Sequence, residues 1–94
     1  MTERASWNEL RNELGVDRAH HAYGAARLAF ELGAEVRALR EQRGWSQTEL
    51  AQRAGMTQSA MARFEAGGTV PTLPVLERIA TALEMRLTVG LTPA

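Results

Sequence analysis

Apolar residues recur at helical spacing along a long central segment of the chain. One set of four is separated by four, four and three positions, which places it on one face of a helix. These residues are Leu28, Leu32, Val36 and Leu39. With Asp17 as a cap and many good helix formers, the spacing predicts a helix over residues 17–43. Gly33 predicts a kink or break near residues 32–33, and a continuous helix is the alternative.

A second apolar stripe follows the same segment and consists of Tyr23, Ala26, Phe30 and Ala34. Two residues of α-helix turn the direction by about 200°, so Phe30 points away from Leu28. A small domain can cover one of these faces with its own core. The other face must be buried in another way. Either Trp7 folds back onto it within the chain, or a second subunit or a different protein packs against it.

The next stretch predicts two short helices joined by a tight turn. Ser46 and Glu49 form a capping-box pattern that starts a helix running to about residue 54, where Gly55 ends it. Thr57 caps the next helix, and Gly67 closes it. So short a connection requires a steep crossing, which is the geometry of a helix-turn-helix. An ordinary helical hairpin with a solvated polar face is the alternative.

Both ends of the chain carry further patterns. Ser6 and Glu9 predict a two-turn helix that ends at Gly15 and has Trp7 and Leu10 on its apolar side. Thr72 predicts the start of a last helix over residues 73–83, with Pro74 in its first turn. The predicted core consists of Leu39, Leu50, Met61, Phe64, Leu76, Ile79, Ala80 and Leu83, with the small Ala51 and Ala54 at the crossing of the two short helices.

Residues 85–92 alternate apolar and polar side chains, which predicts a strand. No second strand pattern exists in the chain, so antiparallel pairing of residues 86–91 across a twofold axis is expected to form a homodimer. A frayed tail is the alternative. The predicted dimerisation residues are Leu87, Thr88, Val89, Gly90 and Leu91.

The charge balance and the cysteine and histidine content of the chain limit the functions that it can have. The chain has 94 residues, with 11 basic residues, all Arg, against 11 acidic ones, so DNA binding is expected to need a dimer and to be salt-sensitive. It has no cysteine, and His20 and His21 have no further ligand at metal-binding spacing. We therefore expect no enzyme, no metal, no cofactor and no membrane span. A cytoplasmic location is expected, with nucleoid association on an operator.

Several of these residues together resemble the Cro/lambda-repressor (XRE) helix-turn-helix family, over residues 32–83. The matching residues are Ser46-Gln47, Glu49-Leu50-Ala51, Ala54-Gly55-Met56-Thr57-Gln58-Ser59, Arg63-Phe64-Glu65, Gly67 and Pro71-Thr72-Leu73. The resemblance implies an all-α, five-to-six-helix lambda-repressor-like DNA-binding domain, here with an N-terminal helical extension and a short C-terminal strand that pairs across the dimer. The chain departs from the family at Ala60 and Ala62, where relatives often carry a hydroxyl.

A dimer of this kind reads half-sites about 34–36 Å apart on a palindromic operator in double-stranded DNA. The expected DNA contacts are Gln47 with phosphate, Gln58 with adenine, Arg63 with guanine or phosphate, Ser59 with base or phosphate, and the exposed methyl groups of Ala60 and Ala62 with thymine, supported by the caps Ser46 and Thr57.

The overall layout is similar to HigA-type antitoxins of type II toxin–antitoxin modules. The resemblance implies a RelE/HigB-like ribonuclease toxin as cognate partner and repression of the shared operon. The expected partner-binding residues are Trp7, Leu10, Tyr23, Ala26, Arg27, Phe30 and Glu31. The predicted domains are an N-terminal extension (1–32), a DNA-binding domain (33–84) and a dimerisation strand with tail (85–94). The alternatives are a stand-alone dimeric repressor and an interaction module that has lost DNA binding.

Overall fold

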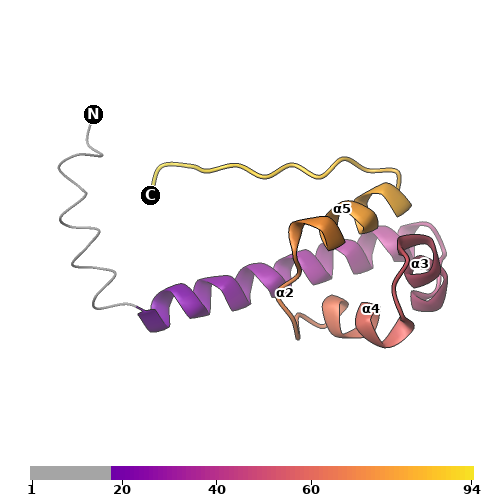
Figure 1. The fold of residues 1–94 in the computed structure, drawn as a ribbon, viewed down its shortest axis with the longest axis horizontal. Helices are drawn as coiled ribbons and strands as arrows, with labels where there is room; N and C mark the ends of the chain where they lie inside the picture. The colour runs from indigo at the N-terminus through magenta and orange to yellow at the C-terminus, as the bar shows by residue number, and fades with distance from the viewer. Residues whose placement is uncertain (1–17) are drawn as a thin grey trace.

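The computed structural model describes residues 18–94, with side chains from Gly24 onward. Four α-helices and no strand occur in this part of the chain (Figure 1). They are α2 (Arg18–Gln42), α3 (Gln47–Ala54), α4 (Gln58–Glu65) and α5 (Leu73–Ala82). The three short helices gather at the C-terminal half of α2, whose N-terminal half extends beyond them.

The predicted break near residues 32–33 is wrong, because α2 continues through Gly33 as one helix. Gly33 has a different role, since it is buried where α2 passes the end of α4. A Cβ at this position would collide with the carbonyl oxygen of Phe64 and lie 2.8 Å from that of Glu65. Gly33 therefore permits a close approach of two backbones.

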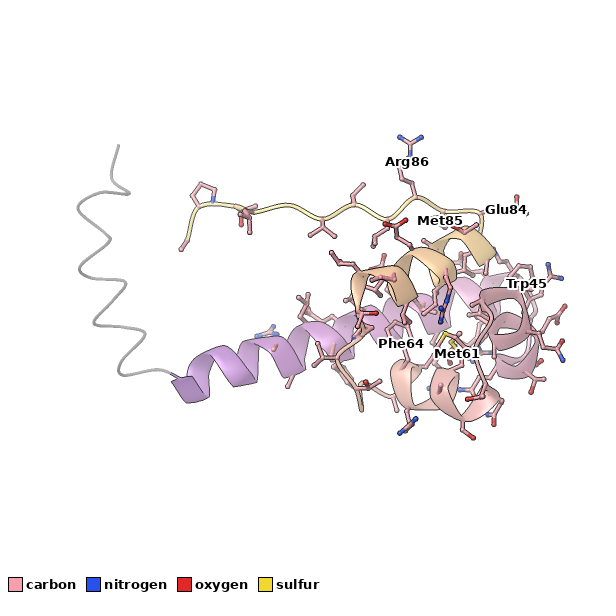
Figure 2. All side chains as sticks on the ribbon, in the orientation of Figure 1. Trp45, Met61, Phe64, Glu84, Met85 and Arg86 are labelled. Carbon is pink, nitrogen blue, oxygen red and sulfur yellow. The ribbon has the colours of Figure 1, made fainter. Side chains whose placement is uncertain are left out.

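The core consists of the apolar faces of all four helices. Met61 and Phe64 are at most 1% exposed and lie at its centre (Figure 2). The buried cluster comprises Val36, Leu50, Ala51, Ala54, Met61, Phe64, Leu76, Ile79 and Leu83, with Leu32 and Leu39 packed against it. This confirms the predicted core except for Leu39 and Ala80, which are half-buried. The predicted stripe on α2 is confirmed at Leu32, Val36 and Leu39, whereas Leu28 is 57% exposed.

The predicted N-caps of the three short helices are confirmed, whereas the predicted cap Asp17 lies outside the described residues. Ser46, Thr57 and Thr72 cap α3, α4 and α5 with their hydroxyl oxygens. Gly55 follows α3 with a φ of +69°, the left-handed conformation that glycine adopts without a Cβ clash, and Gly67 follows α4 with a φ of +76°.

Residues 85–94 do not form the predicted strand within the chain. They run as an extended segment from the end of α5 back along the direction of α2 (Figure 1). The physical reason is that residues 18–84 offer this segment no strand with which it could form a hydrogen-bonded ladder.

Residues 18–94 form four of the predicted five to six helices, because α2 is not divided. The additional helix expected near residues 6–15 lies outside the described residues. Of the helices that the structure describes, none combines the length and the apolar character needed to cross a membrane.

Candidate nucleic-acid interface

The N-termini of α3 and α4 lie side by side and expose a row of polar side chains. Ser46 Oγ accepts a hydrogen bond from the Glu49 N–H at 3.0 Å, and Thr57 Oγ1 accepts one from the Ala60 N–H at 3.1 Å. Both hydroxyl oxygens therefore serve as N-caps of their helices. The caps fix where the first side chains of each helix, Gln47 and Gln58, emerge.

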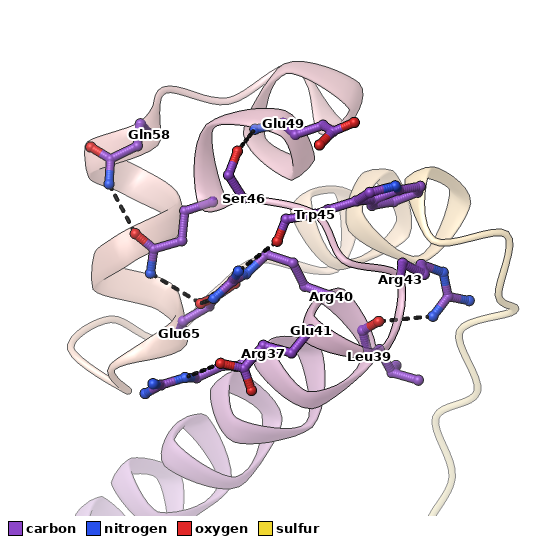
Figure 3. Close-up of polar contacts among 11 residues, drawn as sticks. Arg37, Leu39, Arg40, Glu41, Arg43, Trp45, Ser46, Glu49, Gln58 and Glu65 are labelled. Atoms are coloured by element: carbon purple, nitrogen blue, oxygen red, sulfur yellow. Dashed lines mark hydrogen bonds and ion pairs between the residues drawn. The ribbon is translucent and has the colours of Figure 1, made fainter.

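Gln47 and Gln58 are joined directly. The Gln58 amide nitrogen donates to Gln47 Oε1 at 2.9 Å, and the Gln47 amide nitrogen donates to Glu65 Oε1 at 3.0 Å (Figure 3). Glu65 is 6% exposed and ends α4 on its inner side. This hydrogen-bonded chain ties the first residues of α3 and α4 to one buried carboxylate.

Glu65 also forms a two-point ion pair with Arg40 of α2. Arg40 Nε donates to Glu65 Oε2 at 2.8 Å and Arg40 Nη2 donates to Oε1 at 3.0 Å. The third donor, Arg40 Nη1, reaches the carbonyl oxygen of Trp45 at 2.7 Å. The hydrogen bond to Glu65 raises the pKa of Arg40 against the opposing effect of burial, so the guanidinium stays charged. Arg40 thereby joins α2, the loop before α3 and the end of α4.

The sequence interpretation missed this pair. Its only signal is that Glu65 stands directly after Phe64, on the side of α4 that the apolar spacing assigns to the interior. A buried carboxylate is usually paired with a basic side chain, but its partner here, Arg40, lies 25 residues away in the sequence and is not identified by any local pattern.

The network sets the direction of both amides. A carboxylate only accepts hydrogen bonds, so Gln47 turns its nitrogen to Glu65 and its oxygen to Gln58. Gln58 then uses one N–H on Gln47 and retains its carbonyl oxygen and its second N–H. An oxygen and an N–H side by side match the N6 and N7 edge of adenine in the major groove.

The other predicted DNA-contacting residues are distributed around α4. Ser59 and Arg63 are exposed. Ala60 and Ala62 are half-buried, so the expectation that both methyl groups are exposed is wrong. Ala60 lines a groove against Val70 and Pro71 of the loop that follows α4, which explains its reduced exposure.

Two further arginines stabilise the turn between α2 and α3. Arg53 lies over the Trp45 ring with 4.1 Å between the guanidinium carbon and the ring centroid, and Arg43 lies 5.9 Å from the same centroid. Arg43 also donates to the carbonyl oxygens of Leu39 at 3.0 Å and Leu83 at 2.7 Å. It therefore joins the C-terminal ends of α2 and α5, where carbonyl groups lack helical partners.

The predicted partner-binding residues fall into two groups. Ala26, Arg27, Phe30 and Glu31 are exposed on the N-terminal half of α2, and Phe30 is 61% exposed. Phe30 nevertheless lies against the turn after α4, since a Cβ at Gly67 would be 2.8 Å from the Phe30 Cα. Trp7 and Leu10 lie outside the described residues, and the side chain of Tyr23 is not among those described.

Among the described residues, no three His, Cys, Asp or Glu side chains lie close enough together to hold a metal ion. The polar row lies at the N-termini of two crossed helices, where Gln58 is exposed and oriented by Gln47, and Arg63 is exposed on the same helix as Gln58. Such an arrangement defines a helix-turn-helix DNA-binding domain, whose second helix is the recognition helix.

Comparison with known proteins agrees with this class. The sequence model of the helix-turn-helix domain matches residues 31–89, so the chain belongs to the helix-turn-helix family, of the Cro/lambda-repressor (XRE) type. It is similar to the HTH-type transcriptional regulator SutR of Escherichia coli (strain K12), with 33% identity over 66 residues. The match covers 70% of this chain but 37% of that regulator, so the chain spans well under half of its relative's length.

A solved structure shares the fold. A chain in the structure of a HipA-HipB-O2-O3 complex superposes with a TM-score of 0.59 and 31% sequence identity, covering 69% of this chain and 92% of the other. The chain thus belongs to the helix-turn-helix family and shares its fold with a chain of that complex.

Proposed function

We propose that the chain is the antitoxin of a type II toxin–antitoxin system: as a homodimer it represses its own operon at a palindromic operator, and it neutralises a RelE/HigB-like ribonuclease toxin. The operator half of the proposal is supported above all by the oriented Gln47–Gln58 pair at the N-termini of α3 and α4. The expected C-terminal pairing supplies the dimer.

In this proposal Gln58 reads adenine and Arg63 reads guanine or contacts a phosphate. Both side chains are exposed on α4, five residues apart. Gln47 orients Gln58 and contacts a phosphate with its remaining N–H. Ser59 contacts base or phosphate, and the half-buried Ala60 and Ala62 offer methyl groups to thymine.

The first prediction concerns this reading surface. Gln58→Ala and Arg63→Ala are each expected to weaken specific operator binding by about 1–3 kcal/mol, because each removes a contact to a base edge or phosphate. Gel shifts with the upstream region of the gene measure the effect, and circular dichroism checks that helix content is retained.

Gln52→Ala on α3 and Arg78→Ala on α5 are matched controls, since both residues are exposed and lie outside the polar row. The controls are expected to bind the operator like the parent chain. If the α4 variants also bind like the parent, the assignment of the recognition helix is wrong.

The antitoxin half is supported by the exposed aromatic residue on α2. Phe30 stands on a helix that continues past the helix-turn-helix core, together with the exposed Ala26 and Ala34. Arg27 and Glu31 flank this strip and offer charged partners. An apolar strip with a charged rim is the usual composition of a protein interface. The solved structure with the similar fold contains both HipA and HipB, so a relative assembles with a second protein.

The contact of Phe30 with Gly67 places this strip next to the end of the recognition helix. A partner on Phe30 would therefore lie at the C-terminal end of α4, the helix that carries Gln58 and Arg63. We propose that a toxin bound there takes part in repression together with its antitoxin.

The second prediction tests the partner. Expression of the neighbouring gene alone is expected to arrest growth, and co-expression of this chain is expected to relieve the arrest. Phe30→Asp is expected to abolish relief while retaining operator binding, because a buried charge opposes docking. Leu73→Asp is the matched control, since Leu73 is 55% exposed on α5. Relief by the Phe30→Asp chain would show that the toxin binds elsewhere.

A stand-alone dimeric repressor is the second candidate. It is favoured by the similarity to a protein that is itself an HTH-type transcriptional regulator. A neighbouring gene without any toxic effect would support this candidate, with α2 then serving the dimer.

A further inference from the structure

Two elements flank α4 on different sides of its outward surface. Gln58 is bonded to Gln47 at the N-terminus of α3, with 2.9 Å between the two amides. Ala60 lines a groove together with Val70 and Pro71 of the loop that follows α4. Residues two apart on a helix point about 200° apart, so the start of α3 and this loop lie on different sides of α4.

This arrangement determines which residues approach the phosphates of DNA. An α-helix with its side chains is about 10–12 Å wide, and the major groove of B-DNA is about 12 Å wide. A recognition helix therefore fills the groove, and the elements beside it approach the two sugar–phosphate backbones. In this chain those elements are residues 46–49 on one side and residues 69–73 on the other.

Neither flanking element carries a cation. Residues 46–49 are Ser, Gln, Thr and Glu, and the carboxylate of Glu49 pairs with Arg53 at 3.3 Å. Residues 69–73 are Thr, Val, Pro, Thr and Leu and have no charge. Val70 is 68% exposed and Leu73 is 55% exposed. The outer surface of this loop is therefore apolar, not basic.

The N-terminus of α5, directly after this loop, also offers little to an anion. The N–H groups in the first turn of a helix are a common phosphate-binding site. Here Pro74 has no N–H, and the Val75 N–H donates to Thr72 Oγ1 at 3.4 Å. The Leu76 N–H donates to the Thr72 carbonyl oxygen at 3.0 Å. Of these first-turn groups, the Leu73 N–H is the one left for a phosphate.

Most arginines in the described part of the chain are held by other groups or lie away from α4. Glutamates or backbone carbonyl oxygens accept hydrogen bonds from Arg37, Arg40, Arg43 and Arg53. The N-terminal half of α2, the middle of α5 and the C-terminal segment carry Arg27, Arg78 and Arg86. Figure 2 shows Arg86 pointing into solvent. Arg63 remains as the exposed arginine of α4.

We propose that each copy of the chain meets DNA with one cation, Arg63, and that residues 46–49 and 69–73 contact the backbones through uncharged groups. Non-specific DNA binding comes from neutralised phosphates, so this surface retains non-operator DNA poorly and depends on base contacts. The inference rests on the proposed operator binding and adds its electrostatic character. It departs from the sequence expectation of salt-sensitive binding, because most of the described arginines are engaged within the protein or lie elsewhere.

Gel shifts at increasing salt test the number of cations. The probes are the upstream region of the gene and a duplex of equal length with a scrambled sequence. Two Arg63 side chains per dimer predict a slope of log affinity against log salt of about −1.8, so a rise from about 50 to about 200 mM salt weakens operator binding about tenfold. A protein with about 6–10 phosphate contacts loses about 10³–10⁵ over this range. A loss of about 10³ or more by the parent chain would overturn the inference.

Arg63→Gln tests whether this residue supplies the charge. The variant is expected to make the slope shallower by about 1.8, because each dimer loses two cations. Arg78→Gln is the matched control, since Arg78 is exposed on α5 and lies outside both flanking elements. Equal slopes for Arg63→Gln and the parent chain would overturn the role of Arg63.

Val70→Lys tests the loop by adding a charge. A lysine at this exposed position is expected to reach a phosphate, to strengthen binding of both probes at low salt and to steepen the slope by about 1.8. Thr81→Lys is the matched control, because it adds the same charge at an exposed position in the last turn of α5. Circular dichroism checks that both variants retain their helix content. Equal binding by the two lysine variants would show that the loop does not face the backbone and would overturn the inference.

The outcomes separate this inference from the proposed function. Operator binding that is specific but steeply salt-dependent would overturn the single-cation surface and leave the operator half of the proposal intact. Failure to shift the upstream region even at low salt would overturn the proposed operator binding and, with it, this inference.

Discussion

The buried pair of Arg40 and Glu65 is a contact whose loss is expected to destabilise this domain strongly. The Glu65 side chain is 2% exposed and the Arg40 side chain 11%. In Arg40→Met the carboxylate keeps only the donor of Gln47, at 3.0 Å, and the Trp45 carbonyl loses its bond of 2.7 Å. Breaking one side of such a pair costs about 3–5 kcal/mol, because a buried charge is left without a counter-charge.

That loss is a large part of the free energy of unfolding of a small domain, which is about 5–15 kcal/mol. Urea unfolding followed by circular dichroism at 25 °C measures it. Arg37→Met is the matched control: Arg37 pairs with Glu41 at 3.4 Å, but both side chains are more than half exposed, at 63% and 56%. Its expected cost is below about 1 kcal/mol.

A double variant distinguishes an unpaired charge from lost packing. Arg40→Met combined with Glu65→Met removes both charges and retains apolar volume, so it is expected to be more stable than Arg40→Met alone. The reasoning would be refuted if Arg40→Met cost no more than Arg37→Met, or if the double variant lost the sum of the two single losses.

Two further predictions concern backbone positions. Gly33→Ala is expected to lower the free energy of unfolding by about 1–3 kcal/mol, because the new Cβ meets backbone carbonyls of α4. A Cβ at Gly24 would have no neighbouring atom within 4 Å, so Gly24→Ala is expected to raise the free energy of unfolding by about 0.5–1 kcal/mol. Urea unfolding measures both changes. Equal effects of the two changes would contradict the close approach at Gly33. Glu84 has a φ of +58° after α5, so Glu84→Gly is expected to raise the melting temperature by a few degrees, and a lower melting temperature would argue against strain at this residue.

Much of the helical architecture was predictable because its signals are local. A hydroxyl at Ser46 or Thr57 and a glycine at Gly55 act within one turn of their own helix. The spacing of Met61 and Phe64 likewise assigns their side of α4 to the core before any neighbour is known. The order of the short helices and the steep crossing of α3 and α4 followed from these signals.

The candidate site was predictable only in part. The first residues of α3 and α4, Gln47 and Gln58, follow from the caps, but their bond to each other spans 11 residues of sequence and depends on how the helices cross. The partial burial of Ala60 depends in the same way on the loop near Val70, which no local pattern places.

The sequence by itself determined where the short helices begin and end, and which side of each is buried, because capping and helical periodicity act over a few residues. Only the tertiary structure decided that α2 is continuous at Gly33, that Leu28 lies beyond the core, and that Arg40 is the counter-charge of Glu65. These features depend on which surfaces meet after folding. A glycine that breaks an isolated helix becomes necessary where two backbones touch, and a buried carboxylate takes its cation from whichever helix lies beside it.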